Sequence, residues 1–188
     1  MRRLRWVLAS VLAGVLATGC AGGGGRDAQL RVFDLGGEAT SQSLAPARAG
    51  AVRAVSPFDT ADMLYRLSFR EPGELHAFAR HRWAAAPSTL LQRRFGQASG
   101  AGPCVAEFEI HEALQRFASA EASEFVLEGR GLLVLPGGAR VGERAFRVME
   151  KDAGGNAPAG ARAFARAADR LIAEMAAWAR QTAACRGG

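Results

Sequence analysis

The chain has 188 residues, with 24 lysine or arginine and 18 acidic side chains, a formal net charge of +6 and 49% hydrophobic residues. This length supports one ordinary domain with a real core. The positive charge does not indicate a nucleic-acid partner, because the arginines are scattered along the chain and build no basic motif. A positive surface that faces anionic lipid or an acidic partner stays open.

The first residues are typical of an export signal. Three arginines within the first five residues precede the apolar run WVLASVLAGVLA at 6–17, which is shorter than the roughly 20 residues that cross a bilayer. A buried helix is the alternative interpretation. The glycines at 22–25 disfavour it, because they would separate that helix from any core.

The segment LATGC at 16–20 resembles the lipobox of bacterial lipoproteins, although Ala17 stands where leucine is usual. In such signals a peptidase cuts before the cysteine, and the cysteine thiol carries a diacylglycerol. The resemblance therefore implies a signal peptide at 1–19 and lipidation of Cys20. Acyl chains contribute about 0.8 kcal/mol per buried CH₂, so a multiply acylated cysteine is a lasting membrane anchor.

The residues after the cysteine suggest how the anchor is used. The glycine-rich stretch predicts a tether over 20–28 ahead of a domain at 29–186. Ala21 follows the cysteine where an aspartate would retain a lipoprotein at the inner membrane. By resemblance to that bacterial sorting rule, we expect an outer-membrane anchor and a domain that faces the periplasm.

Cys104 and Cys185 remain besides Cys20. An even pair in an oxidising compartment favours a disulfide, and two separate thiols are the alternative. Neither cysteine has the spacing of a zinc site.

The first half of the domain predicts mostly strands. Alternating or apolar stretches predict strands at 29–35, 51–55, 63–70 and 75–82, with a Gly/Ser/Ala/Pro-rich loop at 36–50. In the third of these, Met63 and Tyr65 share one face and Arg66 lies on the other. A change to helical spacing predicts a short helix from Pro87 to about residue 95.

The second half predicts a long strand from residue 104, strands at 125–135 and 141–149 around a turn at 136–138, and a loop at 151–160. An amphipathic helix of about 20 residues then ends the domain. Its apolar stripe is Phe164, Ala168, Leu171, Met175 and Trp178. We expect an α/β fold, in which a mixed β-sheet packs against helices as an α/β sandwich with one long C-terminal amphipathic helix.

The sequence offers little catalytic chemistry. The three histidines, at 76, 81 and 111, have no metal-ligand spacing, and no nucleophile elbow is present. Glu107 and Glu109 share a strand face, but a paired-carboxylate site needs a second carboxylate that the sequence does not locate. We therefore expect no enzyme activity, no metal and no cofactor.

The segment VSPFDTADMLYRLSFREPGELHAFARHRWAAAPSTLLQRRF, at 55–95, resembles the ABC-type transport auxiliary lipoproteins, the PqiC-like family. Shared features are a strand ending in a proline (Pro57), the pair Tyr65-Arg66, an aromatic strand that ends in Trp83, and a proline-led helix with paired leucines. The long strand VAEFEIHEALQRF and a final alanine-rich helix with a late tryptophan extend the resemblance over about 30–180.

The resemblance implies an envelope accessory that works with an MCE-domain protein and ABC transporter components. These systems move lipids or other apolar molecules between membranes, and the lipoprotein would dock the periplasmic assembly to the outer membrane. A homo-oligomer stays open. Arginine and tryptophan are frequent interface hot spots, so the region is a candidate docking surface; its residues are Tyr65, Arg66, Arg82, Trp83 and Pro87.

Three alternatives accompany this interpretation. Tyr65, Trp83 and Leu90 are core residues in the simplest reading of the pattern. The protein is alternatively a lipid-binding carrier, with an apolar cavity lined by Phe108, Phe125 and Trp178. An envelope enzyme would instead require a pocket with converging titratable groups.

Overall fold

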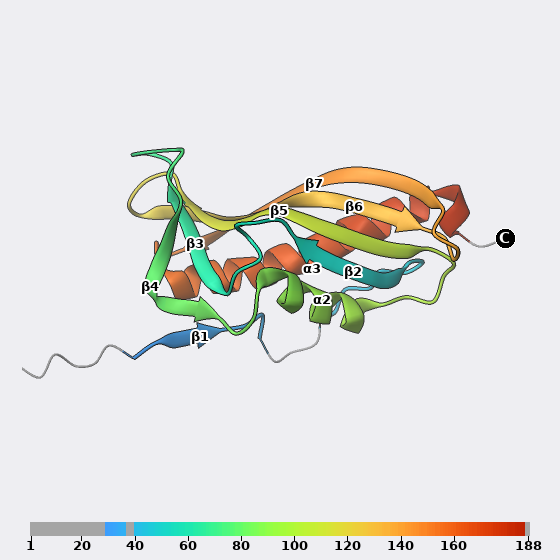
Figure 1. The fold of residues 1–188 in the computed structure, drawn as a ribbon, viewed down its shortest axis with the longest axis horizontal. Helices are drawn as coiled ribbons and strands as arrows, with labels where there is room; N and C mark the ends of the chain where they lie inside the picture. Colours follow the sequence, from blue (N-terminus) through green and yellow to red (C-terminus); the bar gives the residue numbers. More distant parts are fainter. Residues whose placement is uncertain (1–28, 37–39, 187–188) are drawn as a thin grey trace, which may run out of the picture.

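The computed structural model describes residues 29–36 and 40–186. Within them, seven strands form one mixed sheet, and two helices pack on one of its faces around a common core (Figure 1). The α/β fold with a long C-terminal helix is therefore confirmed. Cys20 and the rest of the signal and tether lie outside the described residues.

The strands follow the alternation of the sequence and are longest in the second half of the domain. They are β1 (Arg31–Phe33), β2 (Arg48–Ala54), β3 (Asp62–Leu67), β4 (His76–Trp83), β5 (Val105–Phe117), β6 (Ala122–Val134) and β7 (Arg140–Ala153). The helices are α2 (Pro87–Ala98) and α3 (Ala157–Gln181), and a short 3₁₀ helix, η1 (Ala183–Cys185), follows α3.

Strand β5 organises the sheet. One edge of β5 pairs with β6, and β6 pairs with β7, so the three strands form an antiparallel meander. Two strands share its other edge end to end, both parallel to β5: β2 lies beside the first half and β3 beside the last residues. The strands β4 and β1 extend the sheet beyond β3. As a result β1, β3 and β4 gather at one end of the molecule (Figure 1).

The core lies between the sheet and α3. Small residues dominate the buried stripe of α3, which allows the helix to approach the strands closely. Phe164 of α3 stacks on Phe125 of β6, with ring centroids 4.6 Å apart, and Trp83 of β4 meets the edge of both rings. These three residues are at most 4% exposed.

Several boundaries differ from those that the sequence pattern predicts, and two of the differences have a clear physical cause. Helix α3 begins at Ala157, inside the expected loop, because the side chain of Asn156 caps it by accepting from the Ala159 backbone N–H. Strand β2 begins at Arg48, inside another expected loop. It forms there because β5 offers a parallel partner, with Arg48 opposite Val105.

Candidate functional site

A cluster of aromatic rings lies at the end of the molecule formed by β1, β3, β4 and the β3–β4 turn. Tyr65 lies 4.5 Å from Phe78 and 5.0 Å from His76, between ring centroids. His81 continues the cluster, 6.0 Å from Phe78 and 5.9 Å from Phe33. We call this region the aromatic end; its rings are those of Phe33, Tyr65, Phe69, His76, Phe78 and His81.

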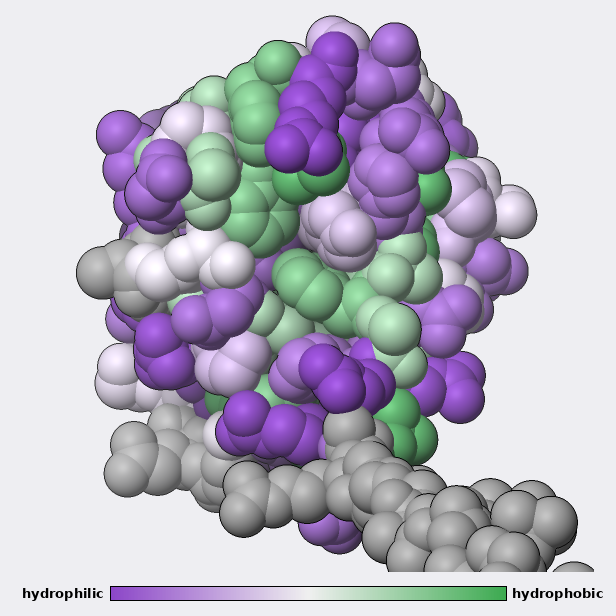
Figure 2. All heavy atoms as spheres, turned by 90° about the vertical axis from the view of Figure 1, so that its left-hand side faces the viewer, coloured by the Kyte–Doolittle hydropathy of each residue, from purple (hydrophilic) through white to green (hydrophobic). Residues whose placement is uncertain are grey.

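Strand pairing brings these rings together. Tyr65 lies opposite His76 in the antiparallel pair of β3 and β4, while the parallel pairing of β1 places Phe33 opposite Trp83. Trp83, at the end of β4, is buried beneath the helices. The rings of the aromatic end are half-buried or exposed. Figure 2 views this end, where apolar patches alternate with charged side chains.

Two arginines at the aromatic end, Arg31 and Arg70, contact rings instead of carboxylates. The guanidinium of Arg31 lies 5.2 Å from the Phe33 centroid, and that of Arg70 lies 5.6 Å from the Phe69 centroid. Among the described residues, no carboxylate lies within ion-pair distance of Arg31, Arg70 or Arg80. Exposed cation–π contacts contribute only about 0.5–1 kcal/mol, so these cations remain available to an anionic partner.

The charge at this end changes the titration of His81. Its partial burial, and then the positive charges of Arg31 and Arg80, lower the pKa of the His81 imidazole from its ordinary value. The neighbouring His76 lies 3.3 Å from the Glu74 carboxylate. The aromatic end therefore combines three arginines without a carboxylate partner among the described residues with a histidine of lowered pKa, while Glu71 and Glu74 lie exposed in its β3–β4 turn.

The sheet face opposite the helices, which we call the open face, has a different electrostatic arrangement. Arg130 links Glu109 and Glu143, at 3.1 and 3.4 Å, and Arg147 lies 3.3 Å from Glu128. The hydrogen bond with His111, together with Arg130, holds the pKa of Glu109 below its ordinary value. Charges of both signs are interleaved along these strands, as expected of a face that meets solvent.

The structure separates the five residues of the predicted docking surface. Trp83 and Pro87 are buried, and they support the core instead of presenting a surface. Arg66 lies on the opposite side of β3 from Tyr65 and forms a 2.6 Å ion pair with Glu112. Arg82 is exposed and lies 3.4 Å from Asp62. Of the five, only Tyr65 contributes a ring to the aromatic end.

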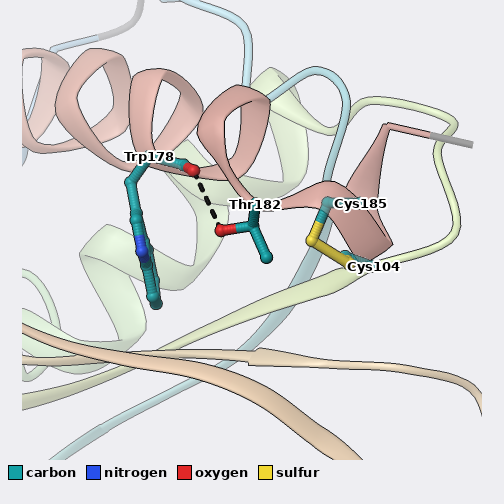
Figure 3. The surroundings of a disulfide bond; sticks show 4 residues. All are labelled: Cys104, Trp178, Thr182 and Cys185. Atoms are coloured by element: carbon teal, nitrogen blue, oxygen red, sulfur yellow. Dashed lines mark hydrogen bonds between the residues drawn. A yellow bond between two sulfur atoms is a disulfide. The ribbon is translucent and has the colours of Figure 1, made fainter.

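The other end of the molecule is closed. Cys104, just before β5, and Cys185 of η1 form a disulfide, with a sulfur–sulfur distance of 2.03 Å (Figure 3). The Thr182 hydroxyl donates to the Trp178 carbonyl at 3.1 Å, where α3 ends. The Trp178 ring lies against Gly142 of β7, where an added Cβ would be 2.8 Å from the ring. We call this region the sealed end.

The three side chains expected around an apolar cavity are packed against other rings. Phe108 and Trp178 both meet the edge of Phe146, at 6.3 and 5.7 Å, and Phe125 stacks on Phe164. Phe108 and Phe125 are each 2% exposed. Core packing therefore fills the space between these three side chains, and they do not face one another across an open cavity in this structure.

The described residues contain no group of three or more histidine, cysteine or acidic side chains placed to hold a metal ion. None of the helices in this part of the chain has the length and apolar character needed to cross a membrane.

The sequence pattern did not single out most of the aromatic end. The pattern assigns no role to Phe33, Phe69 and Phe78, and it gives the histidines no metal-ligand spacing. A signal was nevertheless present, because AFARHRW places arginine between aromatic residues along one strand.

No family model and no curated protein matches the sequence. Solved structures do share the fold. A crystal structure of a Xanthomonas campestris protein, described by the family model DUF330, matches with a TM-score of 0.64 and 16% identity over 80% of this chain and 95% of that chain. An uncharacterized protein matches with a TM-score of 0.62 and 12% identity over 80% and 98% of the two chains.

A candidate lipoprotein from Caulobacter crescentus covers 47% of this chain and 74% of its own, at 17% identity and a TM-score of 0.30, which is too low for an argument. At such identities the first two matches establish a common architecture and nothing finer. The chain is thus similar in fold to the DUF330 protein of Xanthomonas campestris.

Proposed function

We propose that this protein is a lipid-anchored envelope lipoprotein, an accessory of an MCE/ABC-type system that carries lipids or other apolar molecules between membranes. Cys20 holds it in the outer membrane, with the domain in the periplasm. There it docks the MCE-domain assembly and its ABC components to the membrane.

The observation that carries the proposal is the lipobox-like segment at 16–20, placed ahead of a single folded domain. Two others support it. The Cys104–Cys185 disulfide fits an oxidising compartment, and the packed core favours a docking module over a carrier. A lipid anchor raises the local concentration of a docking module at the membrane, which suits an accessory without a catalytic site.

The test is cross-linking of the full chain in its own envelope, followed by purification and mass spectrometry of what is captured. We expect an MCE-domain protein or its ABC partners with the native chain, and a clear loss of both with Cys20→Ala. The mass of the N-terminal peptide, measured on the same material, reports whether Cys20 carries acyl chains.

Capture of only unrelated proteins would contradict the transport role. Apolar small molecules in the eluate would instead support a carrier. An unmodified Cys20 in the native chain would remove the anchor from the proposal.

A further inference from the structure

We propose that the aromatic end is a membrane-facing surface, which rests on the anionic headgroups of the bilayer that holds the anchor. The inference depends on the lipid at Cys20 from the proposed function. It adds an orientation: the aromatic end meets the lipid, and the sealed end projects away from the membrane.

The position of the anchor in the sequence indicates which end of the domain lies nearer the membrane. Ten residues separate Cys20 from Leu30, and an extended chain spans at most about 3.5 Å per residue, so Leu30 stays within about 35 Å of the lipidated residue. The described chain enters the fold through β1, at the aromatic end (Figure 1). The 25 residues of α3 add about 37 Å between this end and the sealed end.

Exposed apolar side chains concentrate at the same end. The large exposed ones in the described chain are Leu30, Val32, Val55, Phe69 and Met149. Leu30 and Val32 lie at β1, and Phe69 lies in the β3–β4 turn. Side chains of this kind, with aromatic rings beside them, are favourable at the boundary between headgroups and acyl chains.

Three arginines favour an anionic surface, beside two exposed glutamates of the β3–β4 turn, Glu71 and Glu74. Arg31, Arg70 and Arg80 have no carboxylate partner among the described residues, unlike the paired arginines of the open face. A guanidinium binds a phosphate through two parallel hydrogen bonds, and its aliphatic stem packs on apolar groups. The combination of free guanidinium groups and exposed rings therefore fits phospholipid headgroups better than it fits a neutral apolar ligand.

The experiment measures contact directly on the lipidated full chain. A nitroxide is attached at Gly73→Cys, in the exposed β3–β4 turn, or at Ala139→Cys, in the exposed β6–β7 turn. Each protein is reconstituted into vesicles of phosphatidylcholine alone or of phosphatidylcholine mixed with phosphatidylglycerol. Collisions with a water-soluble nickel complex then report how far each label is shielded by lipid.

We expect the label at residue 73 to be shielded in the phosphatidylglycerol vesicles and much less in phosphatidylcholine, while the label at residue 139 stays in water in both. An arginine near an anionic membrane favours contact by about fivefold. The triple variant Arg31→Gln, Arg70→Gln, Arg80→Gln therefore lowers the shielded fraction, relative to the exposed one, on the order of 100-fold.

The matched control removes the same charge elsewhere, with Arg53→Gln, Arg140→Gln and Arg147→Gln on β2 and β7. These residues are exposed and lie away from the aromatic end, so shielding should persist. Circular dichroism checks that both triple variants are folded.

Several results would overturn the inference: equal exposure of the label at residue 73 in both vesicles, equal loss of shielding in the control, or shielding that needs an added envelope protein. If Cys20 carries acyl chains, each of these three results refutes the orientation alone and leaves the proposed anchored accessory role intact. A chain without acyl groups on Cys20 instead refutes the anchor itself, and with it the orientation.

Discussion

The two ends of the molecule differ in how far their interactions are satisfied. At the sealed end a disulfide joins Cys104 to Cys185, and the Trp178 ring fills a space left by glycine. At the aromatic end, rings remain half-exposed, and three arginines, Arg31, Arg70 and Arg80, lie without a carboxylate partner among the described residues. The contacts that stabilise the fold therefore gather at the sealed end, and the proposed membrane contact lies at the opposite one. Substitutions that remove contacts at the sealed end should destabilise the fold, whereas substitutions of exposed side chains at the aromatic end should leave it folded.

The largest effect should come from removing the disulfide. The link joins residues 81 positions apart, and loop-closure entropy then predicts that the double variant Cys104→Ala, Cys185→Ala loses about 4.5 kcal/mol of unfolding free energy. Urea denaturation, with the native chain under reducing conditions for comparison, measures it. A loss below about 1 kcal/mol would show that the sealed end is held by packing alone.

A smaller loss is expected for Gly142→Ala. The new methyl group would meet the Trp178 ring at 2.8 Å, so the ring or β7 must shift, at a cost of about 1–3 kcal/mol. The matched control is Gly96→Ala in α2, where nothing lies within 4 Å of the added Cβ. There the same substitution should stabilise the helix by up to about 1 kcal/mol. Equal effects at the two sites, measured by thermal denaturation, would contradict the close approach.

The aromatic end should tolerate substitution. Phe69→Ala removes a ring that is 43% exposed, so we expect the unfolding free energy to change by about 0.5 kcal/mol or less. The same variant should lower lipid shielding at the β3–β4 turn of the reconstituted protein. A large destabilisation with unchanged shielding would reverse the comparison and make Phe69 a structural residue.

The smallest effect concerns the titration of His81. Its pKa lies below the ordinary value of 6.5, so the unfolded chain binds the proton first as the pH falls. The stability that depends on neutral His81 is therefore present above about pH 6.5 and is lost as the pH falls through the folded-state pKa. Arg80→Gln should raise that pKa towards 6.5, while Arg53→Gln should leave it unchanged. An NMR titration of the imidazole protons that shows no difference between the variants would remove Arg80 as a cause.

Much of the fold was predictable because it follows local patterns. The alternation in β5 and the apolar stripe of α3 gave both elements, since burial on one face leaves a clear period in the sequence. The start of α3 was missed, although Asn156 before Pro158 is a helix-start signal, because two glycines just ahead favoured a loop. The first residues of β2 were missed because only a distant strand, β5, makes them a strand.

The candidate site was predicted less well, for a physical reason. Alternation along β3 already placed Tyr65 and Arg66 on opposite faces, so the two could not belong to one surface. The burial of Trp83 depends on Phe164, about 80 residues later in the chain, and no local pattern reveals such a contact. The aromatic end likewise requires β1 to pair with β4, a long-range event that single-strand patterns do not specify.

The shared edge of β5 has a consequence for the folding kinetics. The β5–β6–β7 meander pairs neighbours in sequence and can form early, through short turns. The other edge of β5 stays unpaired until β2 and β3 add to it. Their parallel pairing closes loops of about 50 residues and is intrinsically slow. During that interval a long unpaired strand edge is exposed, which is the site at which a second nascent chain would add and aggregation would begin.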